Sequence, residues 1–146
     1  MRFTPVTGFV LLLLGSITLH FILPTTRVIP SPYYFLGSVF IIFGIVFNYW
    51  ADAQFKKKQT TIQPHEMPNV LVTSGIFRIS RNPIYLGMAS ILLGIAIFWG
   101  TLIVFIFPLT FIIYIERFII PIEEKNLEQK FGKKYLRYKQ KVRRWI

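Results

Sequence analysis

The chain has 146 residues, of which 53% are hydrophobic and only 16% charged, and this composition favours one membrane-embedded domain over a soluble core. Its net charge of +11 is concentrated at residues 56–58, 78–81 and 125–144, between and after apolar runs. Anionic lipid headgroups are therefore the expected partner, and nucleic acid is not. The absence of cysteine excludes disulfides, thiolate zinc sites and a cysteine nucleophile, and we expect no metal site.

Four apolar runs predict four transmembrane helices. The runs 5–23 and 33–50 carry no charge, and the runs 84–99 and 101–115 are joined at Gly100, which predicts a helical hairpin. A span needs about 20 residues, so the last two must extend slightly into the flanking sequence. No small-residue cleavage pattern follows the first run and three further spans do, so we interpret it as a retained helix and not as a signal peptide.

The distribution of lysine and arginine predicts the orientation. The connection at 24–32 carries only Arg27, and the turn near Gly100 carries no basic residue. The loop 51–83 and the tail from residue 116 onward hold nearly all the remaining basic residues. Both termini and the long loop are therefore expected to face the cytoplasm.

The loop 51–83 is long for so small a protein, and connections of more than about 12–15 residues are often functional. Its stretch "NVLVTSGIFRIS" is rich in apolar residues and is expected to lie against the helix ends. Asn82 and Pro83 predict the start of the third span, where a proline in the first turn does no harm. Free N–H groups at this helix start, with Arg78 and Arg81 beside them, would attract an anionic group. The simpler alternative is that these arginines only obey the positive-inside rule.

A second unusual segment follows the fourth span. Glu116, Glu123 and Glu124 make up half of the acidic residues and lie where this span reaches the cytoplasm. Pro121 is expected to interrupt the helix just before the pair and to re-aim the two carboxylates. From Leu127 onward an amphipathic helix is expected on or near the membrane. Its apolar face would carry Phe131, Tyr135, Tyr138 and Val142, with a kink at Gly132.

Two motifs carry a resemblance to a known family. "LVTSGIFRISRNPIYLG" and, after one hairpin, "EEKNLEQKFGKKYLRYKQKV" resemble the isoprenylcysteine carboxyl methyltransferases, which share their cofactor-binding half with the phospholipid N-methyltransferases. The family pattern is Arg-His-Pro-x-Tyr-x-Gly, a hairpin, then Glu-Glu and Phe-Gly-x-x-Tyr, and the match spans about residues 69–142. Asn82 stands in place of the histidine. Ile119 stands where the prenylcysteine enzymes have a substrate-binding arginine, and the nearest arginine is Arg117.

The resemblance implies S-adenosylmethionine bound at the cytoplasmic face, enclosed by the loop and the C-terminal helices. Phe77 and Tyr85 would wall the adenine, Glu123 would accept from the ribose or amino group, and N–H groups near Pro83 would bind the methionine carboxylate. Glu124 completes the acidic pair as a catalytic candidate, and Arg117 is the substrate-side candidate. The residues implied to contact the cofactor are Asn69, Val70, Leu71, Val72, Phe77, Asn82, Pro83, Ile84, Tyr85 and Glu123.

The expected fold is an all-α integral membrane protein with four transmembrane helices, in which a cytoplasmic loop and a C-terminal amphipathic helix close a cofactor pocket. We interpret residues 1–146 as a single membrane domain. Its parts are two N-terminal spans (1–55), the cofactor loop (56–83), the hairpin (84–120) and the C-terminal cytoplasmic helix (121–146).

The expected function is methyl transfer to a lipid-like acceptor that enters from the bilayer and presents a carboxylate, a thiol or an amine. Two alternatives stay open. One is an NADPH-dependent enzyme similar to the sterol reductases, which contain many more spans. The other is a non-catalytic membrane subunit that binds anionic lipid. The sequence leaves the oligomeric state and the identity of the acceptor open.

Overall fold

The structure, a computed structural model, describes residues 4–23, 26–59 and 69–146. Over these residues the regular structure is helical, apart from an isolated bridge between Arg27 and Thr101. The α-helices are α1 (Pro5–Ile22), α2 (Leu36–Lys57), α3 (Pro83–Trp99), α4 (Ile106–Tyr114), α5 (Ile120–Phe131) and α6 (Lys133–Lys141). Shorter 3₁₀ turns occupy Tyr33–Phe35, Gly75–Arg78 and Leu102–Phe105, and a π-helical turn occupies Ile115–Ile119.

Three of the described helical stretches are long and apolar enough to cross a membrane: Pro5–Ile22, Tyr33–Lys57 and Leu102–Phe131. The helix α3 is equally apolar in character but shorter, with 17 residues and a length of about 25 Å. Apolar side chains on the outer faces of α1 and α2 are widely exposed, as expected for surfaces that contact lipid. The protein is therefore an all-helical, multi-pass membrane protein.

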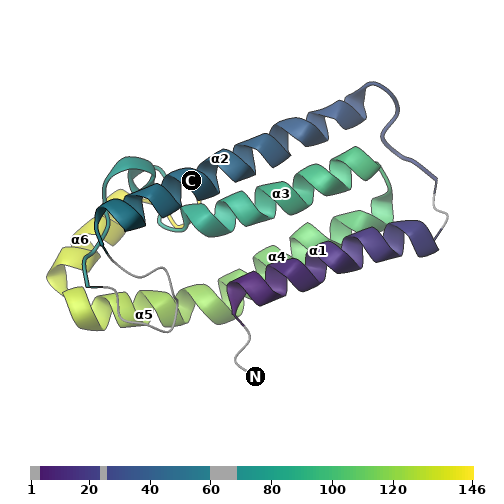
Figure 1. Cartoon of the computed structure of the whole chain (residues 1–146). Coiled ribbons are helices and arrows are strands. Elements are labelled where there is room, and N and C mark those ends of the chain that lie inside the picture. The colour runs from purple at the N-terminus through teal and green to yellow at the C-terminus, as the bar shows by residue number, and fades with distance from the viewer. Residues whose placement is uncertain (1–3, 24–25, 60–68) are drawn as a thin grey trace.

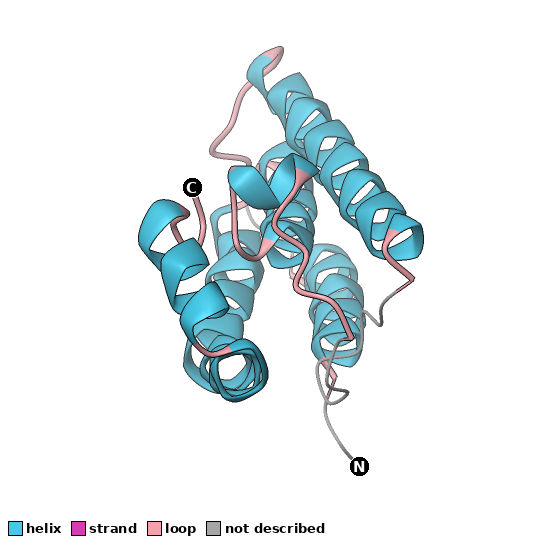
Figure 2. Cartoon of the chain, turned by 90° about the vertical axis from the view of Figure 1, so that its left-hand side faces the viewer, coloured by secondary structure: helices cyan, strands magenta, loops and turns pink. Residues whose placement is uncertain are grey.

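The helices run back and forth, so that functional segments far apart in sequence gather at one end (Figure 1). The helix α2 lies against α3, α3 lies against α4, and α4 lies against α1. The predicted hairpin between α3 and α4 is confirmed. Gly100 ends α3 with a left-handed φ of 68°, and its carbonyl oxygen accepts from the Val28 N–H at 2.7 Å. The opposite end of the helices holds the start of α3, the end of α2, and α5 and α6 (Figure 2).

Small residues on facing surfaces bring α2 and α3 into close contact. A Cβ atom added at Gly37 would collide with the backbone carbonyl oxygen of Gly94. A Cβ atom added at Gly44 would collide in the same way with the carbonyl oxygen of Gly87. These glycines of α2 and α3 therefore pack backbone against backbone, as is common between helices in lipid.

Pro121 does not interrupt the helix before the glutamate pair, contrary to the expectation from the sequence. Helical structure continues from Leu102 to Phe131, a stretch of 30 residues or about 45 Å. The wider π turn at Ile115–Ile119 precedes Pro121 and accommodates a residue that cannot donate and that would clash with the carbonyl of an ordinary α-helix. Since a bilayer core is about 30 Å thick, the last turns of this helix project beyond it and carry the glutamate pair out of the hydrocarbon.

The C-terminal helix expected for residues 121–146 is divided in two, at the position where a kink was expected. Gly132 has a φ of 48° and separates α5 from α6. The expected apolar face survives this break: Tyr135 and Tyr138 are buried, and Phe131 and Val142 pack against the same cluster. The turn at Gly132 folds α6 back over the end of the helices (Figure 2).

We predict that Gly44→Ala lowers the stability of the protein. The added methyl group would meet backbone on α3, which cannot move away, and such overpacking costs about 1–3 kcal/mol. Gly8→Ala is the matched control, because its Cβ would meet only the Tyr114 ring at 3.1 Å and a side chain can turn aside. Thermal unfolding in detergent compares the two. A melting temperature for Gly44→Ala equal to that of Gly8→Ala would contradict this packing.

Candidate functional site

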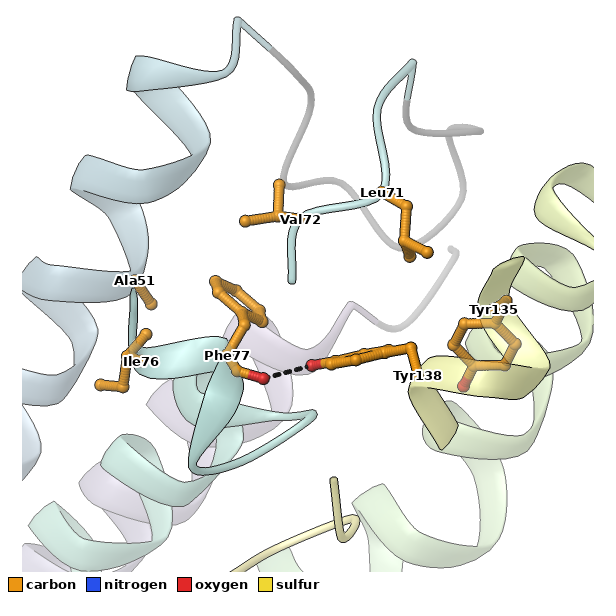
Figure 3. Close-up of a cluster of buried hydrophobic side chains, with 7 residues drawn as sticks. All are labelled: Ala51, Leu71, Val72, Ile76, Phe77, Tyr135 and Tyr138. Atoms are coloured by element: carbon orange, nitrogen blue, oxygen red, sulfur yellow. Dashed lines mark hydrogen bonds between the residues drawn. The ribbon is translucent and has the colours of Figure 1, made fainter. Parts of the chain in front are cut away.

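A cluster of buried side chains joins the long loop to α6 at the end where α3 begins (Figure 3). Leu71, Val72 and Phe77 come from the loop and meet Tyr135 and Tyr138 of α6. The Phe77 ring also packs edge-on against Phe55 of α2, with ring centroids 5.1 Å apart. The full cluster is Ala51, Leu71, Val72, Ile76, Phe77, Tyr135 and Tyr138. The loop is thus packed against the helix ends, as its apolar composition predicted, although residues 60–68 lie outside the described residues.

A buried hydrogen bond fixes the loop to α6. The Tyr138 hydroxyl donates to the backbone carbonyl oxygen of Phe77 at 2.6 Å (Figure 3). Burial raises the pKa of Tyr138, so its hydroxyl keeps the proton that it donates. The carbonyl lies in a 3₁₀ turn, Gly75–Arg78, where the backbone lacks the regular pairing of an α-helix. A side chain from 61 residues further along the chain therefore completes the loop.

The start of α3 lies between two packed regions. Pro83 is buried in the first turn, as predicted, and the Asn82 side chain makes no capping hydrogen bond to the N–H groups that follow. Ile84 packs against the loop cluster and also against a second cluster formed by α3, α4 and α5, which includes Tyr85. The uncapped N–H groups of this first turn are potential donors to an anion.

Tyr85 connects the first motif to the glutamate pair. Its side chain is buried, and its hydroxyl donates to Oε1 of Glu123 at 2.5 Å. The two residues are 38 positions apart and belong to α3 and α5. This contact brings the two motifs together, because α5 continues the fourth span beyond the point where α3 begins.

Glu124, the neighbour of Glu123, is held by three cationic side chains. Oε1 of Glu124 lies 3.0 Å from Nη1 of Arg81, and its Oε2 lies 3.5 Å from Nζ of Lys139. Arg144 donates to both carboxylate oxygens, from Nε and from Nη2, at 3.0 Å each. These hydrogen bonds raise the pKa of Arg144 further above its usual value. The Glu124 side chain is only 10% exposed, and these cations balance the negative charge of its buried carboxylate.

The segment 143–145 is bound along the start of α3, and we call it the C-terminal strap. The Arg144 carbonyl oxygen accepts from the Asn82 amide at 3.0 Å and from the Ser80 hydroxyl at 3.4 Å. The Arg81 N–H donates to the carbonyl oxygen of Arg143 at 3.1 Å. Side chains extend the strap to the fourth span, where Arg144 and the Trp145 indole both donate to Glu116.

Arg144 and Trp145 were not predicted from the sequence as site residues. Arg117 was expected to be the substrate-side arginine, because it is the arginine nearest to Ile119. Arg117 is exposed, and no ion pair within the described part of the chain involves it. The available signal was Trp145 beside Arg143 and Arg144, since a buried indole N–H usually finds a hydrogen-bond partner.

Most residues implied to contact the cofactor lie around these two clusters. Leu71, Val72, Phe77, Pro83 and Tyr85 are buried, whereas Asn82, Ile84 and Glu123 are partly exposed. Asn69 and Val70 are exposed at the edge of the loop. The structure adds one contact that the resemblance did not imply, the hydrogen bond from Asn82 to the strap.

The described residues fit the chemical groups of S-adenosylmethionine. Phe77, Leu71 and Val72 offer apolar surface for an adenine, and Glu123 offers an acceptor for hydroxyl or amino groups. An anion has a partner too: Nε of Arg81 is buried and forms no hydrogen bond within the described part of the chain. A buried guanidinium N–H without a partner, from a residue two positions before an uncapped helix start, suits the carboxylate of an amino-acid moiety.

Comparison with known proteins identifies the family. The family model described as phospholipid methyltransferase matches residues 32–134, which is well over half of the chain. The chain belongs to the phospholipid methyltransferase family. It is also similar to an uncharacterized protein of Haemophilus influenzae, with 45% identity over 62 residues that cover 42% of this chain and 98% of that protein. The resemblance read from the two motifs is thereby confirmed at the level of the family. The family match ends before the C-terminal strap.

We predict that Tyr138→Phe loosens the loop without disturbing the membrane helices. Losing the hydroxyl leaves the buried Phe77 carbonyl without its partner, which costs about 1–3 kcal/mol. Proteolysis of the loop in detergent should become several-fold faster, and the melting temperature should fall. Tyr49→Phe is the control, because Tyr49 is 76% exposed on α2. Equal proteolysis of the two variants would show that this hydrogen bond does not hold the loop.

Proposed function

We propose that this protein is an integral membrane methyltransferase that uses S-adenosylmethionine to methylate a lipid-like acceptor. The observation that carries the proposal is the hydrogen bond from Tyr85 to Glu123, which joins the two motifs of a chain that belongs to the phospholipid methyltransferase family. The fit of Phe77, Glu123 and Arg81 to the parts of the cofactor supports it further. An isoprenylcysteine carboxyl methyltransferase-like subtype is the finer form of this proposal.

The proposed roles of the residues follow from their surroundings. When bound, S-adenosylmethionine supplies an already activated methyl group, so the protein chiefly aligns the reactants and excludes water. The loop cluster around Phe77 would exclude water from one side, and the second cluster around Tyr85 from the other. Glu123 would accept hydrogen bonds from the cofactor while Tyr85 fixes its carboxylate.

The acceptor group determines whether a base is needed. A carboxylate or a thiolate can attack directly, whereas a protonated amine must first lose a proton. Glu124 is bound by Arg81, Lys139 and Arg144, so Glu123 is the better proton acceptor of the pair. We therefore propose a supporting role for Glu124 in place of a direct catalytic one. Arg117, exposed on the π turn, remains the proposed substrate-side cation for an acceptor that approaches from the bilayer.

The site, both termini and the long loop are proposed to face the cytoplasm, with α3 as a fourth crossing. The basic residues of α6 and of the end of α2 lie at the same end of the helices as the site, whereas the opposite end carries Arg27 alone among the described lysines and arginines. The positive-inside rule then places the site end in the cytoplasm. The basic face of α6 would lie over anionic headgroups.

We predict that S-adenosylhomocysteine binds the detergent-purified protein and raises its melting temperature, because a ligand selective for the folded state stabilises it. Titration calorimetry with S-adenosylhomocysteine and with NADPH separates a methyltransferase from a reductase-like enzyme. Glu123→Gln should weaken S-adenosylhomocysteine about ten- to a hundred-fold, since a charged hydrogen-bond acceptor is lost. Glu128→Gln is the control, because Glu128 is exposed on the same helix. Binding of NADPH alone, or equal small losses in both variants, would count against the proposed site.

We predict that single cysteines report opposite sides of the membrane at the two ends of the helices. The chain contains no cysteine, so Thr26→Cys and Gln140→Cys each introduce a single exposed thiol. A membrane-impermeant maleimide should label Thr26→Cys in intact cells and Gln140→Cys only after lysis. The reverse pattern would overturn the proposed orientation.

A further inference from the structure

Two adjacent glutamates at the site have different surroundings. The Glu123 carboxylate accepts from the Tyr85 hydroxyl, whereas Glu124 is bound by Arg81, Lys139 and Arg144. Consecutive residues of a helix point about 100° apart, so the two side chains leave α5 in different directions. The two carboxylates differ in their partners because different segments pack against α5. On the Glu124 side, the strap supplies two hydrogen bonds, both from Arg144.

Of the three cations, Arg144 makes the most extensive contact with Glu124. Its guanidinium donates from Nε and Nη2 to the two oxygens of Glu124 and from Nη1 to Glu116. A planar guanidinium can bridge two carboxylates in this way, and a lysine ammonium cannot reproduce the geometry. The backbone of Arg144 is bound as well, since its carbonyl oxygen accepts from Ser80 and Asn82. The residue is therefore held at both ends.

We propose that Arg144 is a positioning residue of the site, which commits Glu124 to ion pairs and so leaves Glu123 as the carboxylate available to the cofactor. Without Arg144, Oε2 of Glu124 would keep only the longer contact to Lys139. The negative charge of Glu124 would then be only partly balanced by cations. It would repel the neighbouring Glu123 carboxylate, and it would also repel an acidic group of a ligand. This inference rests on the proposed function, and Arg144 lies beyond the residues 32–134 that match the family.

Arg144→Gln tests the proposal, with Arg143→Gln as the matched control. Arg143 is the neighbouring arginine of the strap, but its side chain is exposed and only its backbone carbonyl is used. The affinity for S-adenosylhomocysteine is measured by titration calorimetry, together with the melting temperature. We expect Arg144→Gln to weaken binding about ten- to a hundred-fold, Arg144→Lys to lie between Gln and wild type, and Arg143→Gln to match wild type.

A double variant distinguishes positioning from mere attachment of the strap. If Arg144 acts by neutralising Glu124, then Glu124→Gln combined with Arg144→Gln should recover at least part of the affinity lost in Arg144→Gln alone. If Arg144 only attaches the strap, the double variant should bind no better than Arg144→Gln, and the proposal is overturned. Wild-type affinity in Arg144→Gln would overturn it too.

Two further outcomes are decisive. If Arg144→Gln does not fold, the same comparison is made with Arg144→Lys, alone and combined with Glu124→Gln, and it is judged by the same criteria. If wild-type protein itself fails to bind S-adenosylhomocysteine, the proposed function falls, and the inference falls with it. If wild type binds S-adenosylhomocysteine and the Arg144 variants bind it equally well, the inference about Arg144 is wrong but the proposed function stands.

Discussion

The buried carboxylate of Glu124 is the interaction on which the site end of the molecule depends. An ionised carboxylate with so little exposure is stable only when cations surround it, and breaking one such buried pair typically costs roughly 3–5 kcal/mol. Its partners come from three parts of the chain: Arg81 precedes α3, Lys139 is on α6, and Arg144 is in the strap. One side chain of α5 therefore holds together the start of α3, the last helix and the end of the described chain.

The membrane helices determine where this network can form. Close backbone packing between α2 and α3, at Gly37 with Gly94 and at Gly44 with Gly87, fixes the depth of α3 and hence the position of its first turn. The fourth span is longer than a bilayer core, and the π turn before Pro121 keeps it continuous. Its last turns therefore reach the level of the start of α3, where Tyr85 meets Glu123. A helix that ended at the membrane surface could not bring the two motifs together.

The two glutamates have different surroundings. Glu124 is bound by three cations, whereas Glu123 accepts from one tyrosine hydroxyl, which agrees with the ligand-binding role proposed for it. An electrostatic contrast between neighbouring carboxylates is one way in which a protein makes one acid reactive or ligand-binding and keeps the next inert. In a family whose cofactor carries its own activated group, such alignment and charge placement are the main contributions that the protein can make.

The sequence by itself determined the all-helical membrane fold, the hairpin at Gly100, the start of α3 at Pro83 and the family. These features are local, because they depend on apolar runs, on glycine and proline geometry, and on the spacing of residues within a motif. Only the tertiary structure showed that Pro121 lies within a continuous helix, since a proline ordinarily predicts a helix break and the π turn that accommodates it was not predicted from the sequence. It alone placed Arg144 on Glu124, although they are 20 residues apart, and it left Arg117, the expected substrate-side arginine, exposed. This long-range ion pair forms because the chain turns at Gly132 and because the backbone of the strap is hydrogen-bonded to the start of α3. Neither feature produces a periodic pattern of residues in the sequence.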